Sequence, residues 1–241
     1  MRAEDRAHAR GRLADLLAQA AAGEFPAADG SVEILAQPAE RDAGVISLTG
    51  FAVVFADADP GWIASQLPAG DLSAPLSARF LHALGQRLGR ESHSTDMLTC
   101  ASPLPGPPPA DLELTELNLG GLGLAALGGS AGGTRARIAR AMHYRDEVRA
   151  WQTAGGIVTL GRGVAGRWEV AIEVDPLYRS AGLGSRLASA ARHLVPDGKP
   201  VWAQIAPGNA ASVRAFLRAG FRPIGAEALM APVLSSAAAR L

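Results

Sequence analysis

The stretch from residue 168 to residue 194 restricts the fold of this chain more than any other. It reads WEVAIEVDPLYRSAGLGSRLASAARHL, which is a strand-like run, a glycine-rich turn and a helix-like run in direct succession. Pro176 ends the strand because proline removes a backbone donor, and the leucines and alanines after the turn follow a helical spacing. This order predicts a unit in which a sheet strand leads into a packed helix.

The glycine turn inside this stretch has the chemistry of a phosphate site. Gly182 and Gly184 carry no side chain, so a diphosphate could approach the backbone closely. The amides from about Ser180 onward would face that anion at the start of the helix, and Arg179 would add positive charge. The alternative is an ordinary strand-to-helix turn with an arginine exposed to solvent.

A second glycine run, residues 120–133, fits a dinucleotide fingerprint by its letters but not by its surroundings. Gly121, Gly123 and Ala126 have the G-x-G-x-x-A spacing after a strand-like run. The residues that follow, LGGSAGGT, break a helix, although a helix N-terminus would be needed to hold the pyrophosphate. We therefore interpret this run as a glycine-rich loop and not as an NAD site.

Strand-like and helix-like segments alternate along the rest of the chain, which predicts an α/β or α+β protein with a central sheet. PLPGPPPAD, residues 103–111, predicts a boundary between an N-terminal α/β domain, 1–105, and a second domain, 106–241. The pattern predicts helices at 1–23, 74–90, 136–153, 183–194 and 209–220, and strands at 32–38, 45–57, 96–101, 112–119, 201–206 and 221–234. Residues 155–176 are predicted to form a hairpin whose two strands join near Gly161 to Gly166.

Composition limits the partners of this protein. Lys and Arg number 23 and Asp and Glu number 23, so there is no overall basic field for nucleic acid or an anionic membrane, and we expect neither partner. Cys100 is the single cysteine, which excludes an intramolecular disulfide and a cysteine-built zinc site, and we expect no metal. The N-terminus lacks the apolar core of a signal peptide and no run is long enough to span a bilayer, so we expect a cytoplasmic protein.

Two segments resemble the GCN5-related N-acetyltransferase (GNAT) superfamily. VDPLYRSAGLG, residues 174–184, is similar to its coenzyme A signature, an Arg or Gln followed by x-x-G-x-G/A. NAASVRAFLRAGF, residues 209–221, resembles the next helix of the family, and a strand-like run separates the two segments as in the family. The resemblance implies a twisted mixed sheet flanked by helices, whose two central strands splay apart to admit the pantetheine arm. The N-terminal domain resembles a degenerate copy of the same unit.

The resemblance implies an acetyl-coenzyme A-dependent N-acetyltransferase, a monomer or homodimer, that acetylates a primary amine of a small molecule or peptide by direct attack on the thioester. The alternative is a non-catalytic acyl-coenzyme A-binding regulatory module. The residues that the resemblance assigns to the coenzyme come from the strand, the turn and the following helices: Ile172, Val174, Arg179, Ser180, Ala181, Gly182, Leu183, Gly184, Asn209 and Ser212.

Two carboxylates are candidates for the proton acceptor in such a reaction. Glu169 and Glu173 share one face of the strand because strand side chains alternate, and either could take the ammonium proton, directly or through water. Of the two, Glu169 resembles the position from which members of the family often place a general base. The alternative is that both are cross-strand partners of nearby arginines. Phe216 stands where many family members have a tyrosine that protonates the leaving thiolate, and this difference favours the binding module. Asn209 could also be a simple helix cap.

Overall fold

The computed structural model describes residues 2–121 and 134–232, and the chain forms two compact units. The first unit contains Met1–Leu98 together with Ile224–Leu241, and the second contains Thr99–Pro223. The sequence predicted a single boundary at residue 105, and it did not predict that the chain returns to the first unit from Ile224 onward. Gly123 and Ala126, from the second glycine run, lie outside the described residues.

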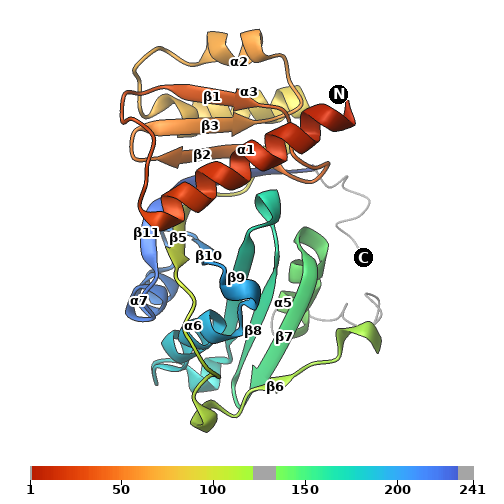
Figure 1. Ribbon diagram of the computed structural model, residues 1–241, viewed down its shortest axis with the longest axis vertical. Helices are drawn as coiled ribbons and strands as arrows, with labels where there is room; N and C mark the ends of the chain where they lie inside the picture. Colours follow the sequence, from red (N-terminus) through yellow and green to blue (C-terminus); the bar gives the residue numbers. More distant parts are fainter. Residues whose placement is uncertain (1, 122–133, 233–241) are drawn as a thin grey trace. The chain divides into compact units, whose positions relative to one another are not determined.

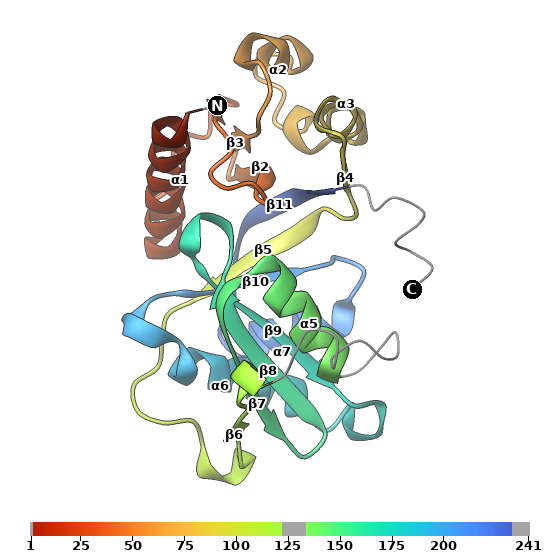
Figure 2. The same cartoon turned by 90° about the vertical axis from the view of Figure 1, so that its right-hand side faces the viewer.

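The first unit is a sheet with helices on both faces. Its strands have the order β1-β3-β2-β11, and β4 also pairs with β11. β1 and β3 are parallel, whereas β2 is antiparallel to both β3 and β11. α1 covers one face of the sheet, and α2 and α3 cover the other (Figure 2). The elements are α1 (Ala3–Ala22), β1 (Val32–Leu35), β2 (Ala43–Leu48), β3 (Phe51–Phe55), α2 (Pro60–Gln66), η1 (Ala74–Leu76), α3 (Ala78–Leu88), β4 (Arg90–Ser92) and β11 (Arg222–Pro232).

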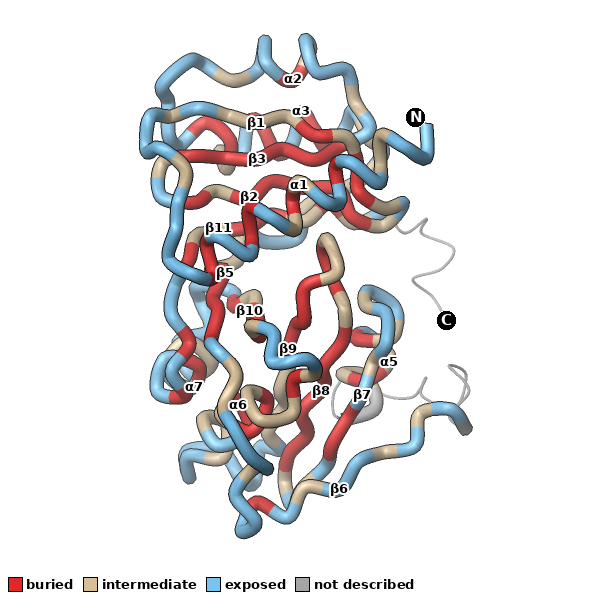
Figure 3. Tube along the Cα trace, viewed as in Figure 1, coloured by how far each residue is buried: buried red, intermediate tan, exposed pale blue. Residues whose placement is uncertain are grey.

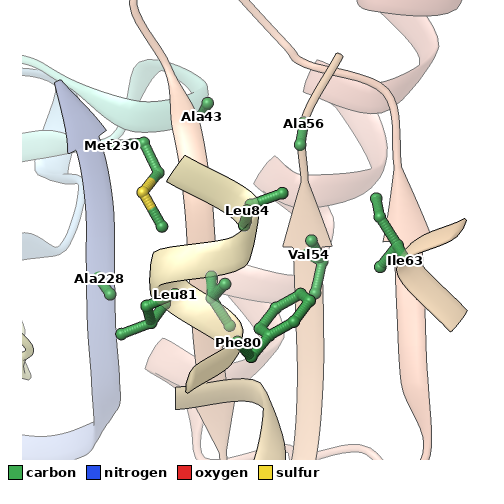
Figure 4. Close-up of a cluster of buried hydrophobic side chains, with 10 residues drawn as sticks. Ala43, Val54, Ala56, Ile63, Phe80, Leu81, Leu84, Ala228 and Met230 are labelled. Carbon is green, nitrogen blue, oxygen red and sulfur yellow. The ribbon is translucent and has the colours of Figure 1, made fainter. Parts of the chain in front are cut away.

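The core of the first unit lies between α3 and the sheet. Phe80 and Leu84 extend from α3 over Val54 of β3 and Ala228 of β11, in one cluster of buried side chains (Figure 4). Every residue of β3 is buried, which Figure 3 shows as an unbroken red strand. The helical spacing of the apolar residues in α3 is therefore explained by a single buried face.

The second unit is a mixed sheet with the order β5-β10-β9-β8-β7-β6 (Figure 1). β9 and β10 are parallel, while β6–β7, β7–β8 and β8–β9 are antiparallel pairs. The elements are β5 (Asp96–Ala101), which enters the unit at Thr99, η2 (Ala110–Leu112), β6 (Thr115–Glu116), η3 (Leu119–Gly121), α5 (Thr134–Tyr144), β7 (Asp146–Thr153), β8 (Gly156–Arg162), η4 (Val164–Gly166), β9 (Trp168–Val174), η5 (Pro176–Tyr178), α6 (Leu183–Leu194), η6 (Pro196–Gly198), β10 (Val201–Ile205) and α7 (Ala210–Arg218).

Neighbouring residues of β8 face different helices because strand side chains alternate. Ile157 packs with Ile138 of α5, whereas a side chain at Gly156 would meet Leu187 of α6. α5 and α6 thus cover opposite faces of the central strands (Figure 2). The predicted α/β class, with a mixed sheet flanked by helices, is confirmed.

β9 and β10 are paired only at their beginnings. The parallel ladder joins Val201 to Trp168 and Trp202 to Glu169 and extends no further, although β9 continues to Val174. β8, by contrast, pairs with β9 over its whole length. The two central strands therefore separate after Glu169, as the resemblance implied.

Two predictions for individual elements differ from the structure, and a further helix was not predicted. The segment 136–153, predicted as one helix, contains most of α5 and then the strand β7, because its second half pairs along β8. The predicted strand 112–119 reduces to Thr115–Glu116. α2 was not predicted, although Asp59 caps it and Pro60 occupies its first turn. Within the described residues, none of the helices has the length and apolar character needed to cross a membrane.

Candidate functional site

A cavity of about 480 Å³ lies where β9 ends and α6 begins. Its walls come from the end of β9, the turn after it, the first turn of α6 and one side of α7. Nine of the ten residues that the resemblance assigns to a coenzyme line this cavity, and Ala181 of the same turn does not. The structure therefore brings together residues that the sequence places up to 40 positions apart, from Ile172 to Ser212.

The glycine turn leaves the start of α6 open. Gly182 is the N-cap of α6 at φ 83°, a left-handed conformation that glycine adopts without strain, and it has no side chain with which to cap the helix. The amides of Leu183, Gly184 and Ser185 have no acceptor within the helix, since the first helical bond runs from Arg186 N to Gly182 O. These amides and the helix dipole give the cavity an anion-binding end.

The two glycines of the turn differ in what they require. A side chain at Gly182 would meet no atom within 4 Å but would keep a strained φ, whereas one at Gly184 would touch Ala215 of α7 at an ordinary 3.5 Å. Arg179, which precedes them, donates from Nε to the carbonyl oxygen of Val174 at 3.2 Å. The backbone conformation is thus the reason for Gly182, whereas the packing around Gly184 leaves room for a Cβ and does not by itself require a glycine.

Asn209 begins the second wall of the cavity. Its Oδ1 accepts a hydrogen bond from the amide of Ser212 at 3.1 Å, so Asn209 is the N-cap of α7. The alternative interpretation of Asn209 as a helix cap is therefore confirmed. Both residues also line the cavity.

Glu169 lies at the point where β9 and β10 separate, and it is buried. Its side chain accepts hydrogen bonds from Arg145 Nε at 3.0 Å, from Arg167 Nε at 2.8 Å and from Gln204 Nε2 at 3.1 Å. The amide of Val164 donates a fourth at 3.3 Å. Burial alone would raise the pKa of Glu169, but the charges of Arg167 and Arg145 outweigh it and hold the pKa below the usual value.

Gly163 makes room for this carboxylate. Any side chain at Gly163 would overlap the carboxyl group of Glu169. The hairpin between β8 and β9 is therefore shaped around the buried anion. Glu169 is not among the residues that line the cavity.

Glu173 has a different environment on the same strand face. It pairs with Arg137 of α5, Nε to Oε2 at 3.4 Å, its side chain is 25% exposed, and it lines the cavity. Both glutamates thus have arginine partners, but these are not the cross-strand partners of the alternative interpretation. Arg137 belongs to α5, Arg145 follows α5 and Arg167 directly precedes β9.

Residues 161–229 match the family model described as FR47-like protein. This span contains β9, the glycine turn, α6 and α7, which supply every residue of the cavity wall except Arg137 of α5. Over these residues the chain is thus similar to a family of the GNAT type. The match begins at residue 161, so the idea that the N-terminal domain is a degenerate GNAT copy stays a prediction.

Two solved GNAT structures are similar to the chain at low identity. One is a GCN5-related N-acetyltransferase from Kribbella flavida, with 17% identity and a TM-score of 0.38, covering 66% of this chain and 66% of that one. Another is a GCN5-related N-acetyltransferase from Sphaerobacter thermophilus, with 17% identity and a TM-score of 0.39, covering 64% of this chain and 56% of that one. The chain thus spans less than two thirds of the length of either structure. No curated protein matches the sequence.

Two further side chains of the second unit, Phe216 and Cys100, are buried and do not line the cavity. Phe216 is 4% exposed and packs edge-to-face on Phe221, with ring centroids 4.9 Å apart. Burial raises the pKa of Cys100 to about 12, so its thiol stays protonated at neutral pH. Within residues 2–121 and 134–232, the structure brings no three His, Cys, Asp or Glu side chains together as a candidate metal site.

Sequence reasoning missed three arginines of the cavity at the start of α6. Arg137, Arg214 and Arg218 line it together with the predicted Arg179. The spacing of Arg214 and Arg218, four residues apart in a predicted helix, was the available signal, because such residues share a helix face. Arg137 lies 36 residues from its partner Glu173 in the sequence, and only the fold brings the two together.

Proposed function

We propose that this chain is an N-acetyltransferase that uses acetyl-coenzyme A and acetylates a primary amine of a small molecule or peptide. The observation that carries the proposal is the cavity at the start of α6, which combines unsatisfied helix amides, arginine side chains and the end of a splayed strand. A diphosphate with a long polar arm suits such a site, because amides and guanidinium groups bind the anion and the unpaired strand edge offers backbone partners to the arm.

The proposed coenzyme supplies a thioester, whose acetyl group is the one transferred. On the protein side, Gly182, Leu183 and Gly184 hold the diphosphate together with Arg179, and Ser180 and Ala181 shape the turn. The backbone of Ile172 and Val174 pairs with the pantetheine arm, while Asn209 and Ser212 flank it from α7. These roles agree with the positions of nine of the ten residues around one cavity.

The two glutamates have separate roles in this proposal. Glu173 lines the cavity and is partly exposed, so we assign to it the acceptance of the ammonium proton, directly or through water. Glu169 is a weaker base because Arg167 and Arg145 lower its pKa, and we assign to it the positioning of the hairpin and of Arg145. Among the described residues that line the cavity, Glu173 is the one acidic side chain.

Phe216 supports a second candidate, a non-catalytic acyl-coenzyme A-binding module. Its ring is buried against Phe221 and has no proton to give a leaving thiolate. A coenzyme A thiol is acidic enough to leave without that proton, so we keep the enzyme as the leading proposal.

Two measurements, made one after the other, test the proposal. First, thermal unfolding of the protein is measured with acetyl-coenzyme A, with coenzyme A and with NAD. Acetyl-coenzyme A and coenzyme A, each at about 100 times its Kd, should raise the free energy of unfolding by about 2.7 kcal/mol, and NAD should not. Stabilisation by NAD but not by coenzyme A would contradict the proposed site. Second, release of free thiol is followed with a panel of amines and peptides, comparing the wild-type protein with Glu173→Gln.

The second measurement separates enzyme from binding module. An enzyme releases thiol only when an amine is present, and Glu173→Gln lowers kcat by roughly 10²–10⁴-fold with little change in coenzyme affinity. Tight coenzyme binding without thiol release across the whole panel would support the binding module instead.

A further inference from the structure

The cavity contains more positive charge than its own carboxylate balances. Of the described residues that line it, Glu173 is the one carboxylate, whereas the arginines are Arg137, Arg179, Arg214 and Arg218. Arg137 is balanced by Glu173 at 3.4 Å. Arg179 belongs to the turn beside the α6 amides, where a diphosphate is expected. Arg214 and Arg218 are therefore left in excess.

The placement of these two arginines on α7 is unfavourable without an anion. They are four residues apart, so they lie on the same helix face, and like charges at this spacing repel and destabilise a helix. Both are exposed, and across residues 2–121 and 134–232 neither has an ion pair with a carboxylate. A dianion between them would remove the repulsion and would be held by charge-assisted hydrogen bonds.

We propose that Arg214 and Arg218 bind a phosphomonoester carried by the same ligand whose diphosphate lies at the start of α6. A phosphomonoester has a charge of about −1.5 to −2 at neutral pH, which two guanidinium groups match. In coenzyme A this group is the 3′-phosphate of the ribose, so the inference rests on the proposed function and adds to it a specificity. The chain distinguishes coenzyme A from 3′-dephospho-coenzyme A through these two side chains.

Titration calorimetry of both coenzymes against four proteins tests this inference. The proteins are the wild type, Arg214→Gln/Arg218→Gln, Arg179→Gln and the control Arg79→Gln, which removes one exposed helical arginine of α3. We expect the wild type to bind coenzyme A about tenfold more tightly than the dephospho form, because the 3′-phosphate forms two exposed charge pairs, with Arg214 and with Arg218. The double variant loses this preference and keeps its affinity for the dephospho form. Arg79→Gln behaves as the wild type.

The remaining outcomes separate this inference from the proposed function. Arg179→Gln should weaken both coenzymes by the same factor, because it acts on the diphosphate that they share. Equal binding of the two coenzymes by the wild type, or a preference that survives in the double variant, overturns only the proposed role of Arg214 and Arg218. Neither result contradicts the proposed function. Failure of the wild type to bind either coenzyme overturns the proposed function and this inference with it.

Discussion

At the scale of single residues, Glu169 and Glu173 show how surroundings divide the roles of identical side chains. They lie on one face of β9, four residues apart; the sequence made both of them candidates, and the family resemblance favoured Glu169 as the general base. Glu169 is enclosed by two arginines, an amide side chain and a backbone amide, whereas Glu173 has one arginine partner and borders the cavity. The first arrangement stabilises the charge of a buried carboxylate, and the second places a partly exposed carboxylate at the wall of the cavity.

Replacing Glu169 should therefore destabilise the protein far more than replacing Glu173. Glu169→Gln leaves Arg145 and Arg167 buried without their anion, and breaking a buried pair from one side costs about 3–5 kcal/mol. Glu173→Gln is the matched control, because its partly exposed pair contributes about 1 kcal/mol or less. Urea unfolding of both variants measures the difference. Equal losses of unfolding free energy would show that the buried cluster does not stabilise the fold.

The same carboxylate predicts how stability depends on pH. The pKa of Glu169 is lower in the folded protein than in the unfolded chain, because Arg167 and Arg145 outweigh the effect of burial. Its contribution is fully present above the unfolded value of about 4.3, and it is lost as the pH falls through the lower folded pKa. Unfolding free energies measured between neutral pH and the acid transition should fall below about pH 4.3, and less steeply in Glu169→Gln. An identical acid slope in both proteins would contradict this assignment.

At the scale of elements, the sequence predicted what is encoded locally. The strand, turn and helix around Gly182 are contiguous, so their order could be anticipated from the sequence, whereas the separation of the two central strands was implied only by the family resemblance. β7 was taken for the end of a helix because its identity depends on pairing with β8 and not on its own pattern. The arginine partners of Glu169 and Glu173 were missed for the same reason, since Arg145 and Arg137 reach them from other elements.

The start of α7 offers a test of whether Asn209 does more than cap its helix. Asn209→Ala removes the acceptor for the Ser212 amide and should cost about 1 kcal/mol of stability. Asn209→Asp keeps a capping oxygen and adds negative charge to the cavity wall. We expect this variant to unfold like the wild type in urea but to bind coenzyme A several-fold more weakly by calorimetry. Unchanged affinity in both variants would limit Asn209 to the capping role.

At the scale of the whole molecule, the chain leaves the second unit, Thr99–Pro223, before it ends. From Ile224 the strand β11 belongs to the first unit, where Ala228 pairs with Val45 of β2 and lies in the buried cluster under α3. A sequence-based division at one proline-rich point could not anticipate this, because the pairing partner of β11 lies about 180 residues earlier in the chain. The integrity of the first unit therefore depends on the last described strand.

A charge introduced into β11 should open the first unit and spare the second. Ala228→Asp buries an unpaired carboxylate, which costs several kcal/mol, while Ala78→Asp is the control at an exposed position in the first turn of α3, where an acidic side chain is favourable. Hydrogen exchange should show lost protection in β2 and β3 of Ala228→Asp, with β8 and β9 still protected and coenzyme A affinity unchanged. Loss of protection in all four strands together would mean that the two units unfold as one cooperative structure, and the cavity would then depend on the N-terminal unit for its stability.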